Sequence, residues 1–227
     1  LLAVPLALAL LVFLLALAAS GGAALWEATD AATPVLLACA AGAFILCNAV
    51  IRDTDETGSR NRVMLLAGAV LAAGILPLVV FAAISMGIRI NQHGLSPERI
   101  WALISIAVAS AYGLAAWVAL ARGRRAGWSE GLRQANLRLA AGVCVLALIL
   151  ALPLWDFGSL SARNQVARLA SGKVQVAEFD FAALRWDFGD AGREALAELG
   201  RGEIGGEGEV AELARAAEAQ TERPWDD

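Results

Sequence analysis

Long parts of this sequence lack charged residues altogether. Five runs contain no Asp, Glu, Lys, Arg or His, and they cover residues 1–19, 35–51, 63–88, 100–121 and 139–155. A helix of about 20 apolar residues spans the hydrocarbon core of a bilayer, where the backbone must satisfy its own hydrogen bonds. Core helices of a soluble protein would instead show polar residues on one face, about 3.6 residues apart. The runs therefore predict an all-α fold, a polytopic transmembrane helix bundle with five spans in residues 1–155.

Residues that bind metals or transfer protons are also scarce. His93 is the only histidine, and the cysteines Cys39, Cys47 and Cys144 lie inside apolar runs without CxxC spacing. Any histidine-based proton relay or metal site would have to include His93, and no partner that would tune an acid or base is identifiable beside it. The sequence therefore predicts no catalytic residues, no metal site and no cofactor.

The few charges are divided unevenly along the chain. Residues 1–155 have a net charge of +3, whereas residues 156–227 have a net charge of −7. The chain starts inside an apolar run without an initiating Met, so we expect it to be the C-terminal part of a longer protein. A signal peptide is the alternative interpretation of residues 1–19, but its basic leader is missing and four more spans follow.

Basic residues in the short loops predict the orientation in the membrane. The loops at 52–62 and 122–138 together contain eight of them, and the loop at 89–99 contains two. Cytoplasmic loops carry an excess of Arg and Lys, so the loops at 52–62 and 122–138 should be cytoplasmic. The tail should then lie outside, in the periplasm of a bacterial cell. This orientation also explains the RGRR stretch in the loop at 122–138 without a nucleic-acid partner.

Three tryptophans lie near the predicted span ends, where an interfacial aromatic belt would place them. They are Trp101, Trp117 and Trp155.

The loop between the third and fourth runs is the most patterned polar segment between spans. Ser96 can cap the following helix, Pro97 fits its first position, and Glu98 suits the positive end of the helix dipole. This capping pattern does not require His93. We take His93, Glu98 and Arg99 as candidate interaction residues, and a membrane-embedded enzyme would use the same three.

The tail is predicted to form a small helical extramembrane module at 156–200. An acidic linker with a short helix, partly disordered, is expected at 201–227. Aromatic and apolar residues that could form a small core, or contact the bilayer surface, are Phe179, Phe181, Leu184 and Trp186. A module of this size is near the lower limit for independent folding, so we expect its stability to depend on contact with the membrane domain.

Local signals place three helices in the tail. Ser159 or Ser161 can start a helix that ends near Ala170, Asp190 can cap a helix at 191–199, and a polar helix is expected at 209–219. The tetrapeptide WDFG occurs twice, directly before the first two of these helices. The glycine-rich loop, strand lysine and catalytic loop that accompany a kinase DFG are missing, so the two copies predict similar turns that enter helices.

Three motifs in the loop and the tail resemble a known family. They read INQHGLSPERIWAL at 90–103, LSARNQVARLASGKV at 160–174 and FDFAALRWDFGDAGREAL at 179–196. The first looks like a GLTPER-type helix entry, and the last follows the pattern FDFxxLRxxFGxxGRxAL, both of the domain of unknown function 4153 family. The resemblance covers the last four spans and the start of the tail. It implies a polytopic bacterial inner-membrane protein with additional spans before Leu1, and it implies no activity.

Three hypotheses about function follow from these observations. The first is a membrane protein whose outer module binds an envelope partner or senses a condition there, with the bilayer as its other partner. Contact candidates on the first tail helix are Arg163, Asn164, Gln165 and Arg168. The alternative is a subunit or fragment of a transporter, although transporters usually keep ionisable groups at membrane depth and these spans have none. A membrane-embedded enzyme is the least favoured.

Overall fold

The computed structural model describes residues 2–29, 31–52, 54, 58–59, 61–123, 127–152, 154–204 and 208–223. The described residues form helices, turns and irregular segments, with no strand among them. They divide into two compact units. The membrane unit comprises Leu1–Ile88 and Ala102–Ala151, and the C-terminal module comprises Arg89–Trp101 and Leu152–Asp227. The module therefore joins the tail to the turn between two membrane helices.

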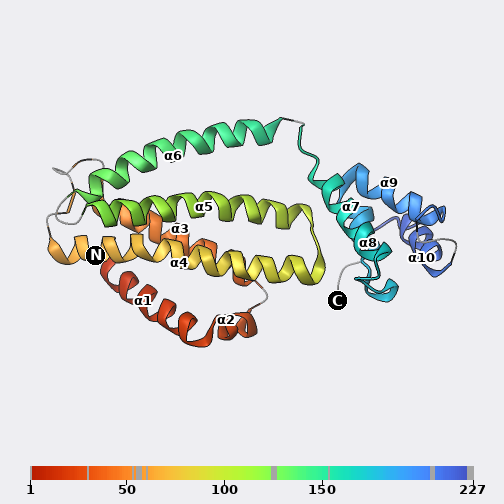
Figure 1. Ribbon diagram of the computed structural model, residues 1–227, viewed down its shortest axis with the longest axis horizontal. Coiled ribbons are helices and arrows are strands. Elements are labelled where there is room, and N and C mark those ends of the chain that lie inside the picture. The colour runs from red at the N-terminus through yellow and green to blue at the C-terminus, as the bar shows by residue number, and fades with distance from the viewer. Residues whose placement is uncertain are drawn as a thin grey trace. The chain divides into compact units, whose positions relative to one another are not determined.

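Five helices in the described part of the chain are long and apolar enough to cross a membrane, which confirms the predicted spans. Their most apolar windows have mean hydropathy values from 1.8 to 2.6. They are α1 (Ala3–Ser20), α3 (Ala32–Ile51), α4 (Arg62–His93), α5 (Pro97–Arg122) and α6 (Trp128–Ala151), and a short helix, α2 (Ala23–Ala28), follows α1 (Figure 1).

The last membrane helix, α6, begins earlier than the span predicted at 139–155 and also ends earlier, at Ala151. Helix α6 starts at Trp128 rather than at residue 139 because its polar first turns have partners inside the membrane unit. Arg133 pairs with Glu130 at 2.8 Å and donates a hydrogen bond to the carbonyl oxygen of Ile51, 3.2 Å away. Asn136 donates to the side-chain oxygen of Asn48 at 2.9 Å. These bonds link the start of α6 to the end of α3.

Helices α4 and α5 lie side by side in the membrane unit (Figure 1). A Cβ on Gly113 would lie 3.0 Å from the Cα of Leu76, so the glycine lets the two backbones approach closely. Pro77 lies inside α4 and has no N–H to donate to the carbonyl of Ala73. The indole nitrogen of Trp117 donates to that carbonyl at 2.9 Å instead. Trp117, which the sequence assigns to an aromatic belt, thus supplies the hydrogen bond that the Ala73 carbonyl cannot receive from Pro77.

The C-terminal module contains four α-helices and a short 3-10 turn in its described part. They are α7 (Phe157–Ala170), η1 (Val176–Glu178), α8 (Phe181–Trp186), α9 (Gly189–Gly200) and α10 (Glu209–Glu218). Four residues were predicted to form the core of this module. Phe179, Phe181 and Leu184 are buried, whereas Trp186 is only half-buried. Phe188, Leu196 and Leu199 complete the core without having been predicted.

Helix α10 belongs to this core, although the sequence sets 201–227 apart as a linker with a short helix. Ala211, Ala214 and Ala217 recur at a spacing of three and are buried, two of them within the core cluster. Small side chains at this spacing let α10 pack closely on α9 and α8. Residues 205–207 and 224–227 of this segment, which the sequence predicts to be partly disordered, lie outside the described residues.

The helix starts in the module correct two predictions. Asp156, not Ser159 or Ser161, caps α7, because its carboxylate accepts a hydrogen bond from the Ser159 amide at 2.9 Å. Asp190 does not cap α9: it lies in the first turn and pairs with Arg193. The two WDFG copies therefore differ, since the first aspartate begins a helix and the second, Asp187, follows the end of α8.

Candidate functional site

The turn between α4 and α5 is held by side chains from the tail. Arg168 of α7 donates hydrogen bonds from its guanidinium to the carbonyl oxygens of Asn91, at 3.2 Å, and Gln92, at 2.6 Å. These carbonyls belong to the last turn of α4, where no further helical N–H is available and the helix dipole is negative. Arg168 is only 7% exposed, so the charge of its guanidinium is stabilised by these carbonyls.

Two neighbours of Arg168 complete this contact, which we call the turn clamp (Asn164, Gln165 and Arg168 on residues 91–95). The Gln165 amide donates to the carbonyls of His93 and Leu95 at 2.8 and 2.9 Å. The Leu95 amide donates to the Asn164 side-chain oxygen at 2.9 Å. Between them lies Gly94, with a φ of +75°. The clamp thus satisfies the backbone groups of the turn from outside it.

Arg99 binds the same turn from within α5. Its guanidinium donates to the carbonyls of His93 and Gly94 at 3.2 and 2.8 Å. The Arg99 amide donates to the Ser96 hydroxyl at 3.3 Å, and α5 begins at Pro97, which confirms the predicted helix entry. The side chains of His93 and Glu98 are exposed. The structure therefore brings six of the seven candidate residues to one region, and Arg163 lies exposed on a different face of α7.

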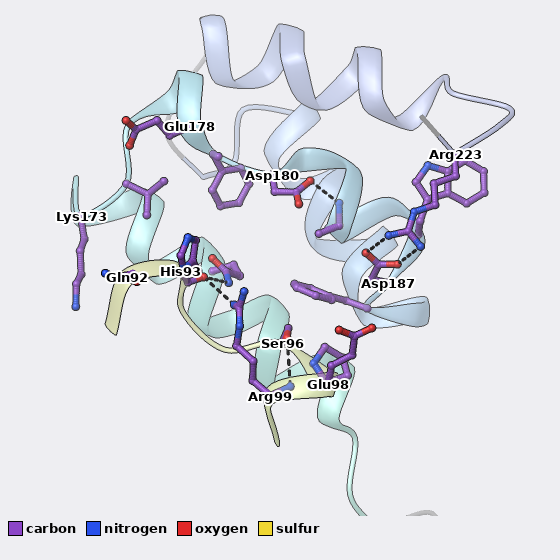
Figure 2. Close-up of a pocket in the computed structure, with 17 residues that line it drawn as sticks. Gln92, His93, Ser96, Glu98, Arg99, Lys173, Glu178, Asp180, Asp187 and Arg223 are labelled. Atoms are coloured by element: carbon purple, nitrogen blue, oxygen red, sulfur yellow. Dashed lines mark hydrogen bonds and ion pairs between the residues drawn. The ribbon is translucent and has the colours of Figure 1, made fainter. Parts of the chain in front are cut away.

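A cleft of about 700 Å³ lies within the C-terminal module, beside the turn clamp (Figure 2). One wall is the α4–α5 turn, and the other is formed by 173–180, α8 and Arg223. Its acidic side chains are Glu98, Glu178, Asp180 and Asp187, and its basic side chains are Arg99, Lys173 and Arg223. His93 and three aromatic residues, Phe179, Trp186 and Phe188, also line it.

Asp187 and Arg223 form an ion pair at one end of the cleft (Figure 2). Two guanidinium nitrogens of Arg223 each lie 2.9 Å from a carboxylate oxygen of Asp187. Burial raises the pKa of the Asp187 carboxyl above its usual value; Arg223 opposes this shift, and the negative charges of Asp180 and Glu98 add to it. One cation therefore faces three carboxylates, and this end of the cleft is electronegative.

Lys173 and Glu178 lie at the opposite end of the cleft, which therefore carries one basic and one acidic side chain (Figure 2). The Lys173 ammonium lies 3.5 Å from the side-chain oxygen of Asn91. Among the described residues, no group of three or more His, Cys, Asp and Glu side chains could hold a metal ion. The arrangement is suited to binding a ligand or protein segment that carries both charges and an apolar part.

The sequence did not identify most of the cleft. Nothing in local spacing marks Lys173, Glu178, Asp180, Asp187 and Arg223 as the lining of one site. Three of them lie within the motifs that resemble the family: Lys173 in the motif at 160–174, and Asp180 and Asp187 in the motif at 179–196. Arg223 follows a helix that the sequence places outside the module.

Comparisons with known proteins give a family but no activity. A family model described as "Domain of unknown function (DUF4153)" matches residues 1–199. The match includes α1 as well as the last four spans, and it ends within α9. No curated protein and no solved structure matches the chain.

Proposed function

Because the chain belongs to the DUF4153 family, whose function is unknown, and is a multi-pass membrane protein by its five apolar helices, we propose that it is a binding or sensing protein of the bacterial inner membrane. Its C-terminal module lies outside the cytoplasm and binds a charged segment of an envelope partner in the cleft. The observation that supports this proposal is the cleft itself, which is electronegative around Asp187 and is also lined by three aromatic side chains.

The turn clamp gives this binding a physical consequence. Gln92, His93 and Glu98 line the cleft, and they lie at the end of α4 and the start of α5. The same turn is fixed by Arg168 and Gln165 from the tail. A partner in the cleft would therefore contact both the tail and the ends of two membrane helices, which is the arrangement that a sensor needs to couple binding to its membrane domain.

The side of the membrane on which the module lies can be tested directly. Two reporters are fused after Asp227 of the full chain, one active only outside the cytoplasm and one active only inside it. Since eight basic residues lie in the two loops predicted to be cytoplasmic and two in the alternate loop, we expect activity from the outside reporter alone. Activity of the inside reporter would place the module in the cytoplasm and refute an envelope partner.

The cleft is tested by photocrosslinking in intact cells. A photoreactive amino acid replaces Glu178 on the cleft, and the control replaces Glu194, which is exposed on α9 outside the cleft. We expect a discrete protein adduct from position 178 and none from position 194.

Charge dependence separates cleft binding from chance proximity. Asp187→Asn should reduce the adduct several-fold, because it leaves the Arg223 guanidinium without its carboxylate and makes this end of the cleft less attractive to a basic group of the partner. Asp190→Asn, which removes an exposed carboxylate from α9 outside the cleft, should leave the adduct unchanged. Equal adducts from positions 178 and 194, or an adduct that does not respond to Asp187→Asn, would rule out the cleft as the binding site.

A further inference from the structure

An exposed apolar surface on the C-terminal module begins where α6 ends. Leu154 and Trp155 follow α6 and are 70% and 59% exposed, and Leu160 in α7 is 52% exposed. Soluble domains rarely leave large contiguous apolar surface in water. We call these residues the junction patch; all are exposed except Phe157, which is half-buried, and they are Trp101, Leu152, Leu154, Trp155, Phe157 and Leu160.

The patch connects the two membrane helices that enter the module. Trp101 lies in the second turn of α5, and its ring packs edge-on against Phe157, the first residue of α7, with centroids 5.4 Å apart. Leu152 directly follows Ala151, the last residue of α6. Because α5 and α6 are membrane spans, chain continuity keeps Trp101 and Leu152 at the boundary of the hydrocarbon core.

Helix α7 has three faces, and one of them extends the patch. Ala162, Val166 and Leu169 face the core of the module. The second face carries the turn clamp. The third carries Leu160 and, one turn later, Arg163, both exposed. Within the described residues, Arg163 has no hydrogen-bond or ion-pair partner.

We propose that the junction patch and Arg163 form a lipid-binding surface that lays α7 on the bilayer. Trp and Phe rings with an apolar body suit the interfacial region of the membrane, and Trp is enriched there. The apolar stem of Arg163 can lie along the same surface while its guanidinium reaches lipid phosphates. The clamp fixes α7 against the α4–α5 turn, so Leu160 and Arg163 stay together on the third face.

The test measures what surrounds Leu160 in the full chain. Cys39, Cys47 and Cys144 are replaced, Leu160→Cys is labelled with an environment-sensitive fluorophore, and the protein is placed in nanodiscs of phosphatidylcholine and phosphatidylglycerol. Leu213→Cys is the matched control, since Leu213 is an exposed leucine on α10 outside the patch. We expect headgroup-region spin-labelled lipid to quench the label at position 160 several-fold more than at 213, and aqueous iodide to show the reverse order.

Arg163→Glu tests the charged part of the surface. In the same nanodiscs it should lower lipid quenching at position 160, whereas Arg193→Glu on α9 should not. Equal iodide quenching at positions 160 and 213 would overturn the proposal. Shielding of position 160 from both quenchers would also overturn it, because that result indicates cover by protein rather than lipid.

Discussion

Gly94→Ala is expected to separate the α4–α5 turn from α7. Gly94 has a φ of +75°, and a Cβ there would lie 2.8 Å from both the Arg168 Cδ and the Gln165 amide nitrogen. The left-handed backbone costs an alanine about 1–2 kcal/mol. Displacing Arg168 from its carbonyls leaves a buried charged donor without partners, which costs about 1.5–3 kcal/mol. The combined loss is about 2.5–5 kcal/mol, so hydrogen exchange of the α7 amides should accelerate by roughly 100-fold or more.

Gly172→Ala separates the two causes of this loss. Gly172 has a similar φ of +70°, but no atom lies within 4 Å of its Cβ position. It follows α7 directly, so the same amides report on it. Only the backbone cost of about 1–2 kcal/mol should appear, which gives roughly 10-fold faster exchange. Both variants are measured by hydrogen exchange and mass spectrometry on the full chain in nanodiscs. Equal acceleration in the two variants would show that the clamp contributes nothing.

The membrane helices could be predicted from the sequence because one property decides them. A run without charge must be helical in lipid, whatever its neighbours are. The boundaries could not be predicted in the same way. Helix α6 extends back to Trp128 through Glu130 and Arg133, whose charges find partners on each other and on Ile51. A hydropathy pattern counts such residues as loop because the partner is far away in the sequence.

The turn clamp shows the same limit in the tail. The motifs at 90–103 and 160–174 are visible in the sequence, but their contact joins residues about 70 positions apart. Asn164, Gln165 and Arg168 were predicted to contact a partner because they are polar and lie on one helix. In the structure their polar groups bind the backbone of residues 91–95, so Arg163 is the tail candidate whose charge faces outward.

The cleft depends on tertiary structure even more strongly. Its two ends combine the α4–α5 turn, the segment before α8, and Arg223 beyond α10. Arg223 reaches Asp187 only because the alanine face of α10 docks on α9 and α8. Alanine carries little hydrophobic signal in a sequence this rich in it, so the helix reads as polar and the cleft residue beyond it cannot be recognised.

Gly192→Ala should destabilise the C-terminal module, because Gly192 lies where α9 approaches α8 most closely among the glycines of α9. A Cβ at Gly192 would overlap the carbonyl oxygen of Leu184 in α8 and lie 2.7 Å from the Cβ of Phe188. Neither atom can move alone, since one is backbone and the other belongs to a buried core residue, so α9 must shift away from α8. Overpacking of this kind costs about 3 kcal/mol, and the α9 amides should exchange roughly 100-fold faster.

Gly200→Ala on the same helix is the matched control. The atom nearest to its Cβ position is Cγ of the Arg215 side chain, at 3.3 Å, and this flexible chain can give way. Alanine is a better helix former than glycine by about 1 kcal/mol, so exchange should stay unchanged or slow slightly. Opposite signs at positions 192 and 200 would establish that α8 and α9 pack through Gly192, and that the Leu196 and Leu199 core depends on it. Unchanged exchange in Gly192→Ala would refute this packing, and with it the wall that places Asp187 in the cleft.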